Sequence, residues 1–457
     1  MLDNTQASPG PQEGAFIEAQ VTGLAHGGAG VARVEGLVVC VRGGLPGDTV
    51  RARVRARKRA FAEADAVEIL LPSPQRVPPV CAHFGACGGC HWMDLAYDAQ
   101  LAHKQAQVTD CLSRIGGLES VAMRPIVPSP RALGYRNKME FSFDGEESRL
   151  IAGLHRADDP SRIEPIRECH LQDPAANRIL AWTVSACREA RFSGSRDPSR
   201  PGALRRLILR RGSDGRFLVI FDTRVTRFPE GVDLARRLSE AFPEVSGVVH
   251  TSAAAEDAGP ATVLAGEGTL REEGGGLVMK VTAGAFLQVN PEQAAQLYRQ
   301  VEAWADPGPD DTLLDLFCGA GAITLRLAGK LGRATGVESS AEAVRCAEEN
   351  ARANDLANCT FLHADAPRAA VELARAGHVF DLLVVNPPRA GLTRDLVHAA
   401  GYLAPKRAVY VSCDPATLAR DLAWLRDEGL RATDAAPFDM FPHTWHVETV
   451  VRLERAA

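Results

Sequence analysis

The chain has 457 residues, of which 46% are hydrophobic and 24% are charged, and at roughly 150 residues per domain it should form about three domains. This composition excludes a disordered chain, a collagen-like fibre and a coiled coil. No apolar run reaches the roughly 18–20 residues that a membrane helix needs, and the polar N-terminus lacks the basic-then-apolar pattern of a secretion signal. We therefore expect a cytoplasmic protein without a membrane partner.

The net charge of −5 is distributed unevenly along the chain. Residues 51–59 carry six positive charges and no negative ones, residues 196–216 have a net charge of +5, and residues 131–140 have a net charge of +2, so the remainder carries −18. Segregated charge of this kind is expected of a protein with one polyanion-binding face. Solvated strand faces would produce the same runs.

Residues 1–13 are predicted to form a disordered tail. From residue 14 to residue 72, short alternating strands are separated by glycine-rich turns, which is typical of a small OB-like β-barrel. The alternation in VRARVRARKR places Val50 and Val54 inside this barrel and the basic side chains on its outer face. The candidate RNA-binding residues of this strand are Arg51, Arg53, Arg55, Arg57, Lys58 and Arg59.

Residues 73–285 are predicted to form a central α+β domain, which follows a proline-rich linker over 71–79 and contains a helix over 94–118. Its most specific feature is a C-x5-C-x2-C motif whose glycines let three thiols converge. Convergent thiolates in a reducing compartment need a cation and a fourth ligand. A compact triplet with one distant cysteine favours an iron–sulfur cluster over zinc. The four candidate ligands are Cys81, Cys87, Cys90 and Cys169.

Residues 286–457 alternate between strands and helices, which predicts a doubly wound, Rossmann-like sheet with its ligand at the carboxyl ends of the strands. In DLFCGAG, Gly319 and Gly321 would let a ligand approach a helix N-terminus. Glu338 ends the next strand, where an acid would accept ribose hydroxyls. The opening acid and the missing third glycine favour S-adenosylmethionine over a dinucleotide. Asp365 ends the third strand and would meet the adenine, or it only caps a helix.

Three further residues are predicted to face the same crevice. Cys413 follows a strand and precedes a helix in YVSCDPATLARDL, and a helix N-terminus lowers the pKa of a thiol. Glu448 lies in FPHTWHVETVV, and Arg389 ends the NPPR motif. Cys413 alone could be a structural cysteine. Beside a carboxylate, an arginine and a methyl donor, it is interpreted as a nucleophile.

Five motifs, FLQVN, DLFCGAG, NPPRAG, YVSCDPATLARDL and FPHTWHVE, resemble those of the RNA uracil-5-methyltransferase family. The similarity runs from about residue 14 to residue 452, with the motifs in the family's order. The cysteine motif makes the ribosomal branch with an iron–sulfur cluster the most similar, and the first domain resembles a TRAM RNA-binding barrel. The resemblance implies methyl transfer from S-adenosylmethionine to carbon 5 of a uridine, with 23S ribosomal RNA as the expected partner of a monomeric enzyme.

By that resemblance, Cys413 is the nucleophile, Glu448 is the general base, and the four cysteines hold a [4Fe-4S] cluster. The helix over 94–118 would pack with the catalytic domain. The residues expected to bind S-adenosylmethionine are Gln288, Phe317, Gly319, Gly321, Glu338, Asp365 and Asn386. Two positions depart from the family pattern, because Asn386 stands where members commonly have Asp, and Ala322 stands where they commonly have Asn.

The chemistry of uracil suits these roles. A thiolate that adds at carbon 6 makes carbon 5 reactive toward a methyl donor, and Arg389 could steady the charge that develops on the uracil oxygen. The target carbon is hidden in folded RNA, so we expect the nucleotide to be flipped out, and Phe286 offers a stacking surface.

Two other readings stay open. NPP motifs also serve methyltransferases that act on exocyclic amines, which would form no covalent intermediate. A non-catalytic RNA-binding protein built around the cluster is the alternative from a different class. The target could also be a transfer-RNA uridine.

Overall fold

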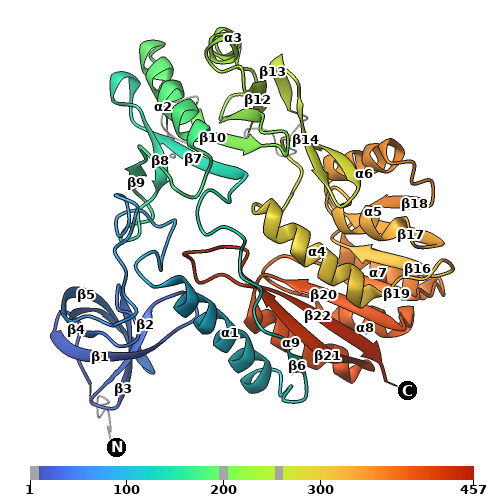
Figure 1. The fold of residues 1–457 in the computed structure, drawn as a ribbon, viewed down its shortest axis with the longest axis horizontal. Helices are drawn as coiled ribbons and strands as arrows, with labels where there is room; N and C mark the ends of the chain where they lie inside the picture. Colours follow the sequence, from blue (N-terminus) through green and yellow to red (C-terminus); the bar gives the residue numbers. More distant parts are fainter. Residues whose placement is uncertain (1–9, 195–203, 253–260, 457) are drawn as a thin grey trace, which may run out of the picture.

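A computed structural model of the chain describes residues 10–194, 204–252 and 261–456. Most of the predicted tail 1–13 and the first part of the basic run 196–216 lie outside these residues. The described chain forms a closed barrel, a seven-stranded sheet, an eight-stranded sheet and a two-stranded hairpin (Figure 1). The predicted fold class, a Rossmann-like α/β unit preceded by a small barrel and a central α+β part, is confirmed.

The N-terminal barrel closes around small and β-branched side chains. In its fourth strand, Val50, Ala52 and Val54 are buried while Arg51 and Arg53 are exposed, because successive side chains of a strand point to opposite faces. The barrel strands, in spatial order, are β1 (Phe16–Leu24), β2 (Gly30–Val34), β3 (Leu37–Arg42), β5 (Phe61–Leu71) and β4 (Thr49–Arg57).

The proline-rich segment that follows the barrel is fixed to it. Arg76 pairs with the buried carboxylate of Asp48 at 2.7 Å and with Asp94. Asp48 also accepts hydrogen bonds from the backbone N–H groups of Leu45 and Ser73. Burial acts to raise the pKa of Asp48, but these hydrogen bonds and the Arg76 charge hold it below its usual range. The predicted linker is therefore a packed connection between the barrel and the rest of the chain.

The central region is a mixed sheet with its own buried core. Two helices pack on it, α2 (Pro174–Glu189) and α3 (Gly231–Ala241). The strands, in spatial order, are β13 (Thr262–Gly266), β12 (Val245–Ser252), β11 (Phe217–Thr223), β10 (Leu204–Arg211), β7 (Lys138–Asp144), β8 (Ile151–His155) and β9 (Ile163–Pro165), with a short helix η1 (Glu147–Arg149) after β7.

The C-terminal sheet has five parallel strands followed by an antiparallel pair. Its strands, in spatial order, are β18 (Cys359–His363), β17 (Arg333–Glu338), β16 (Thr312–Leu316), β19 (Leu382–Val385), β20 (Arg407–Ser412), β22 (Glu448–Arg455), β21 (Leu430–Phe438) and β6 (Ala122–Met123).

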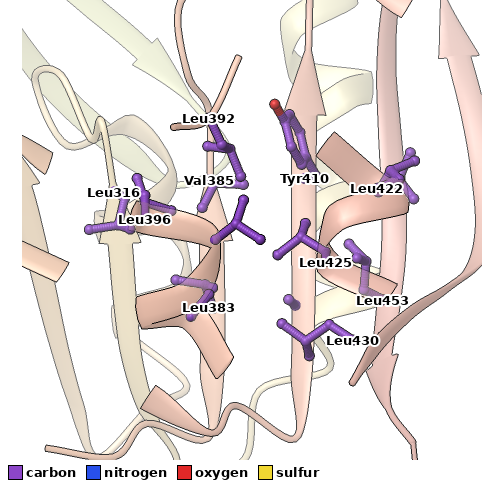
Figure 2. Packing of buried hydrophobic residues seen from close by; sticks show 14 of the residues in the cluster. Leu316, Leu383, Val385, Leu392, Leu396, Tyr410, Leu422, Leu425, Leu430 and Leu453 are labelled. Atoms are coloured by element: carbon purple, nitrogen blue, oxygen red, sulfur yellow. The ribbon is translucent and has the colours of Figure 1, made fainter. Parts of the chain in front are cut away.

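Helices cover both faces of this sheet. One face carries α7 (Ala366–Arg375), α8 (Arg394–Leu403) and α9 (Pro415–Asp427), whose leucines and alanines pack on the strands around Tyr410 (Figure 2). The other face carries α4 (Pro291–Ala305), α5 (Ala322–Ala328) and α6 (Ala341–Ala353), and the hairpin of β14 (Thr269–Gly274) and β15 (Leu277–Thr282) packs on α6.

Helix α1 (Tyr97–Arg114) lies on the C-terminal sheet although it precedes the central region in sequence (Figure 1). Val108 and Leu112 belong to the same buried core as α9. Lys104 makes an ion pair with Asp439 at 2.5 Å, and both side chains are fully buried. None of the helices in the described part of the chain is both long and apolar enough to cross a membrane.

The buried pair between Lys104 and Asp439 predicts a large loss of stability when one partner is removed. Replacing Lys104 by Met should lower the free energy of unfolding by about 3–5 kcal/mol, because it leaves a buried carboxylate without its cation. Urea unfolding measures this change. The double variant Lys104→Met, Asp439→Leu should recover much of the loss, and Arg368→Ala, in an exposed pair with Glu372, should leave the free energy of unfolding nearly unchanged. A Lys104→Met variant as stable as the parent would contradict this account.

Candidate active site

The carboxyl ends of the parallel strands bring several predicted residues together. Phe317 follows β16, Glu338 ends β17, Asn386 follows β19 and Cys413 follows β20. Because β17, β16, β19 and β20 are parallel neighbours, these four positions meet at one edge of the sheet. The alternating strand and helix pattern of the sequence specifies this arrangement.

A pocket opens at this edge, beside the glycine-rich turn. Phe286, Phe317, Gly319 and Asn386 line it. Phe317 and Gly319 both have left-handed backbone conformations, with φ of +65° and +57°. A phenylalanine in this region is strained, and such strain is concentrated at functional sites. The strained turn therefore marks this pocket as a candidate ligand site.

Asp315, which sequence reasoning left unassigned, contributes to the same pocket. Thr324 donates a hydrogen bond to one carboxylate oxygen at 2.5 Å, and the other, Oδ1, is buried without a partner among the described residues. Burial raises the pKa of Asp315 to about 7. An unsatisfied buried acceptor in a pocket wall fits the cationic amino group of a ligand such as S-adenosylmethionine. The acid that opens DLFCGAG was the available signal for it.

The other predicted cofactor contacts do not line this pocket. Glu338 lies beside it, where its carboxylate accepts hydrogen bonds from the N–H groups of Gly319 at 3.1 Å and Ser340 at 2.9 Å. Asp365 is exposed and caps α7 by accepting a hydrogen bond from the Arg368 N–H, which is the alternative that the sequence had left open.

Two further predicted cofactor contacts also lie outside the lining of this pocket. Gln288 is buried, and its backbone carbonyl oxygen accepts a hydrogen bond from the Asn137 side chain at 3.3 Å. Gly321 caps the N-terminus of α5 with a left-handed backbone.

Cys413 and Glu448 are neighbours across two strands. The antiparallel pairing of β20 with β22 places Ser412 opposite Thr449, so Cys413 and Glu448 are next to each other at the strand ends. Glu448 is 4% exposed. Its burial raises the pKa to about 7, against the opposing effect of Arg389. A carboxylic acid that titrates near neutral pH is suited to proton transfer.

The prediction that a helix N-terminus lowers the pKa of Cys413 is wrong for this structure. Burial raises that pKa to about 11, and the nearby Glu448 adds to the rise, while Arg389 opposes it. Asp414 follows Cys413 and caps α9, where its carboxylate accepts hydrogen bonds from the N–H groups of Ala416 and Thr417. The N–H groups at the start of α9 therefore donate their hydrogen bonds to Asp414 and do not stabilise the Cys413 thiolate.

Arg389 stands beside this pair on an exposed turn. Its guanidinium lies 3.3 Å from the ring of His446, and its carbonyl oxygen accepts a hydrogen bond from the Thr417 hydroxyl. Burial and the Arg389 charge lower the pKa of His446 to about 3, so this imidazole is neutral at physiological pH. The site thus places one thiol, one carboxyl and one guanidinium close together at this edge of the sheet.

The four predicted cluster cysteines line one pocket in the central region. Burial raises the pKa of Cys87 to about 11, and Cys169 and Cys81 add to that rise, so these sulfurs are close in space. Among the described residues, no three His, Cys, Asp or Glu side chains converge tightly enough to hold a single metal ion. In a four-iron cluster each thiolate binds a different iron, which requires wider spacing than one ion does. The four cysteines share one pocket, and the cluster itself stays a prediction.

The basic strand β4 carries less free charge than its sequence implies. Arg51 and Arg55 are exposed but face acids on β5, at 3.9 Å from Glu68 and 2.7 Å from Glu63. Arg53, Arg57, Lys58 and Arg59 complete the run, with Arg57 half-buried and the other three exposed. The outer face of the barrel is therefore a mixed surface in which acids of β5 neutralise part of the charge.

Over its described part, the second basic run makes ion pairs and backbone hydrogen bonds within the protein, and its role as a polyanion-binding face stays a prediction. Arg205 and Arg206 both contact the carboxylate of Asp222 at 2.8 Å. Arg210 is buried and donates to three backbone carbonyls, those of Thr282, Ala283 and Ala285. These arginines hold the central region together. Arg196 and Arg200 lie outside the described residues.

Comparisons with known proteins agree with this geometry. A TRAM domain model matches residues 11–67, and a tRNA (uracil-5-)-methyltransferase model matches residues 267–456. RNA methyltransferases of Halalkalibacterium halodurans and Nitratidesulfovibrio vulgaris are each 36% identical to this chain, with 96% of both chains covered. The structure of the Pyrococcus abyssi tRNA (uracil-54, C5)-methyltransferase in complex with S-adenosyl-L-homocysteine superposes with a TM-score of 0.74, at 26% identity, covering 95% of this chain and 99% of that one.

The fold and the site define an S-adenosylmethionine-dependent methyltransferase with a Rossmann-like catalytic sheet. The chain belongs to the RNA uracil-5-methyltransferase family, and it begins with a TRAM domain. The family and the type of enzyme predicted from the sequence motifs are confirmed.

Because Glu448 is buried, replacing it by a neutral side chain should stabilise the folded protein at high pH and not at low pH. The pKa of its carboxyl is about 7 in the folded protein, compared with roughly 4.3 in an unfolded chain. Above pH 7 the folded protein must bury a charge, a cost that fades as the pH falls through 7 and is absent below about 4. Glu448→Gln should therefore raise the thermal unfolding midpoint at pH 8 and leave it nearly unchanged at pH 4. An equal effect at both pH values would show that the carboxyl is not held at a raised pKa.

Proposed function

We propose that the protein transfers a methyl group from S-adenosylmethionine to carbon 5 of one uridine in 23S ribosomal RNA, through a covalent bond between Cys413 and the uracil. The observation that carries this proposal is the juxtaposition of Cys413, Glu448 and Arg389 at the strand ends, beside the pocket of the glycine-rich turn.

The first step follows from the low reactivity of uracil carbon 5. The Cys413 thiol gives its proton to solvent as its sulfur adds to carbon 6, so that negative charge spreads to the uracil oxygen and carbon 5 becomes nucleophilic. Arg389 would stabilise that charge, since its guanidinium already opposes the rise in the pKa of Cys413. S-adenosylmethionine, when bound, supplies an electrophilic methyl group, and the pocket lined by Phe317, Gly319 and Asn386 is where we expect it to bind.

Glu448 would complete the reaction. After carbon 5 has gained the methyl group, Glu448 removes the remaining proton from that carbon, and the bond between the Cys413 sulfur and carbon 6 breaks with the thiolate as leaving group. A pKa of about 7 leaves a substantial fraction of the carboxyl ionised at neutral pH. The buried position of Glu448 also keeps water away from the transferred proton.

The RNA would be held by several parts of the chain. Phe286 is 64% exposed at the rim of the cofactor pocket, where it can stack on a flipped or neighbouring base. On the barrel, Arg53, Lys58 and Arg59 are exposed basic side chains of β4 and the turn after it, and they could contact phosphates. Since one chain carries the proposed nucleophile, the proposed base and the cofactor pocket, we propose that it acts as a monomer. We also propose that it acts in the cytoplasm.

The ribosomal target rests on the combination of a barrel with a four-cysteine site, which marks the ribosomal branch that the motifs resemble. A transfer-RNA uridine is the second candidate, because the solved relative from Pyrococcus abyssi acts on tRNA and is covered over 99% of its length.

We also propose that Cys81, Cys87, Cys90 and Cys169 hold a [4Fe-4S] cluster that supports the central region. Their shared pocket also contains apolar side chains, including Met93, and lies against the core of the central sheet. No step of the methyl transfer needs a redox change, so the cluster's role would be structural.

The covalent mechanism predicts opposite behaviour for two variants. Cys413→Ala should form no adduct and no 5-methyluridine, because the nucleophile is missing. Glu448→Gln should accumulate a denaturation-resistant RNA adduct that depends on S-adenosylmethionine, because the proton on carbon 5 stays in place. Gel electrophoresis of radiolabelled RNA measures both. An enzyme that acts on an exocyclic amine would leave no adduct with any variant, nor with 5-fluorouridine RNA.

The target is identified by mapping 5-methyluridine in the ribosomal and transfer RNA of cells that lack the gene. We expect one position in 23S RNA to lose its methyl group and to regain it with the wild-type gene but not with the Cys413→Ala gene. Loss at a transfer-RNA position instead would select the second candidate, and unchanged maps at all positions would overturn the assignment.

The cluster predicts about four iron atoms per chain and a broad visible absorption band in protein purified without oxygen. Cys169→Ser should lose iron and the band and unfold at a lower temperature, because the fourth ligand is removed. Cys187→Ser, at a buried cysteine of α2 outside the cluster pocket, should keep the iron. Zinc in place of iron would contradict the cluster.

A further inference from the structure

The loop between the first two barrel strands touches the catalytic turns directly. This loop, residues 25–29, lies between β1 and β2 and is closed by a hydrogen bond from the Ala25 N–H to the Ala29 carbonyl at 2.8 Å. Two of its residues, His26 and Gly28, contact the catalytic domain. We refer to it as the His26 loop.

His26 faces the turn that carries the proposed nucleophile. Its Nε2 lies 3.5 Å from Oδ2 of Asp414, the residue directly after Cys413. The Gln107 side-chain amide donates to Nδ1 of His26 at 2.9 Å, which makes Nδ1 the acceptor and directs the Nε2 proton toward Asp414. The other oxygen of Asp414 caps α9. His26 and the helix therefore hold the same carboxylate from two sides.

His26 also contacts the loop that leads to the proposed base. Its ring packs edge-on against Trp445, with 4.7 Å between ring centroids. Trp445 lies 3.9 Å from the ring of His446, which contacts Arg389. Through these contacts the barrel braces the segment immediately before Glu448.

Gly28 shows that the approach of the loop is close. Its φ is +88°, and a side chain there would begin 3.0 Å from the Trp445 ring. The carbonyl oxygen of Gly28 accepts a hydrogen bond from Nε1 of Trp92 at 3.0 Å, and Trp92 is almost fully buried. The His26 loop is thus held by Trp92 as well as by its contact with Trp445.

We propose that His26 is a positioning residue for the methyl transfer, by which the TRAM barrel holds the Cys413 turn and the Trp445 loop in their reactive arrangement. This inference rests on the proposed role of Cys413. It gives the barrel a part in the chemistry in addition to RNA binding, because a misplacement of about 1 Å can cost roughly a hundredfold in rate.

The test measures the single-turnover rate of covalent adduct formation on saturating 5-fluorouridine RNA, together with the dissociation constant of the unmodified RNA. The RNA is whichever of two transcripts, 23S ribosomal RNA or transfer RNA, the wild type methylates. For His26→Ala we expect the rate at saturation to fall about ten- to hundredfold, with the dissociation constant changed by less than about threefold. His26 is partly exposed, so the fold should tolerate the change.

Two further variants separate the contacts. His26→Gln keeps a donor for Asp414 and should recover most of the rate, whereas His26→Phe keeps only the aromatic contact with Trp445 and should recover less. The matched control is His378→Ala, which removes another exposed histidine that stacks on an aromatic ring, Phe380, before β19. It should match the wild type in both measurements.

Two results would overturn the inference. One is a wild-type rate for His26→Ala. The other is a larger dissociation constant for the RNA with an unchanged rate at saturation, since His26 would then be an RNA contact. Failure of the wild-type protein itself to form an adduct on either transcript would refute the covalent mechanism, which is a separate outcome.

Discussion

The register between β20 and β22 is the constraint on which the site depends. It is an antiparallel pairing at the end of an otherwise parallel sheet, and it sets Ser412 opposite Thr449. One strand leaves the sheet at Cys413 while the other enters it at Glu448, so a thiol and a carboxyl from distant parts of the sequence become neighbours. A slip of one residue would turn one of the two side chains to the other face of the sheet. The buried, apolar interior of both strands prevents that slip.

The loop before β22 has no regular structure of its own, and the N-terminal half of the chain holds it in place. Lys104 of α1 pairs with Asp439 and donates to the Phe441 carbonyl. Gln100 accepts a hydrogen bond from the His443 N–H at 2.8 Å. The barrel adds the contact of His26 with Trp445. Helix α1 and the N-terminal barrel therefore both hold the loop before β22 in place. This role is consistent with the packing of helix α1 on the catalytic sheet instead of on the central one.

The sequence was sufficient for the features that repeat along a strand or helix. Period-two alternation in the barrel and the strand–helix alternation after residue 290 both correspond to elements in the structure. Pairings between distant segments were not predictable in this way. The charge runs are the clearest case, because the partners of Arg206 and Arg55 are Asp222 and Glu63 on neighbouring strands. A run of like charge along one strand says nothing about the strand beside it.

The same limit applies to the chemistry of Cys413. A position before a helix suggests an activated thiolate, but in the structure the helix amides donate to Asp414, and the thiol is half-buried next to Glu448. With a pKa of about 11, the sulfur is almost entirely protonated at neutral pH when no substrate is bound. In the proposed mechanism, its activation would come from the bound uracil, whose oxygen takes up negative charge near Arg389 as the carbon–sulfur bond forms. A thiol held in this state resists oxidation, because oxidation also requires the thiolate. In the proposed mechanism, the same environment would keep the Cys413 thiol reduced until RNA binds.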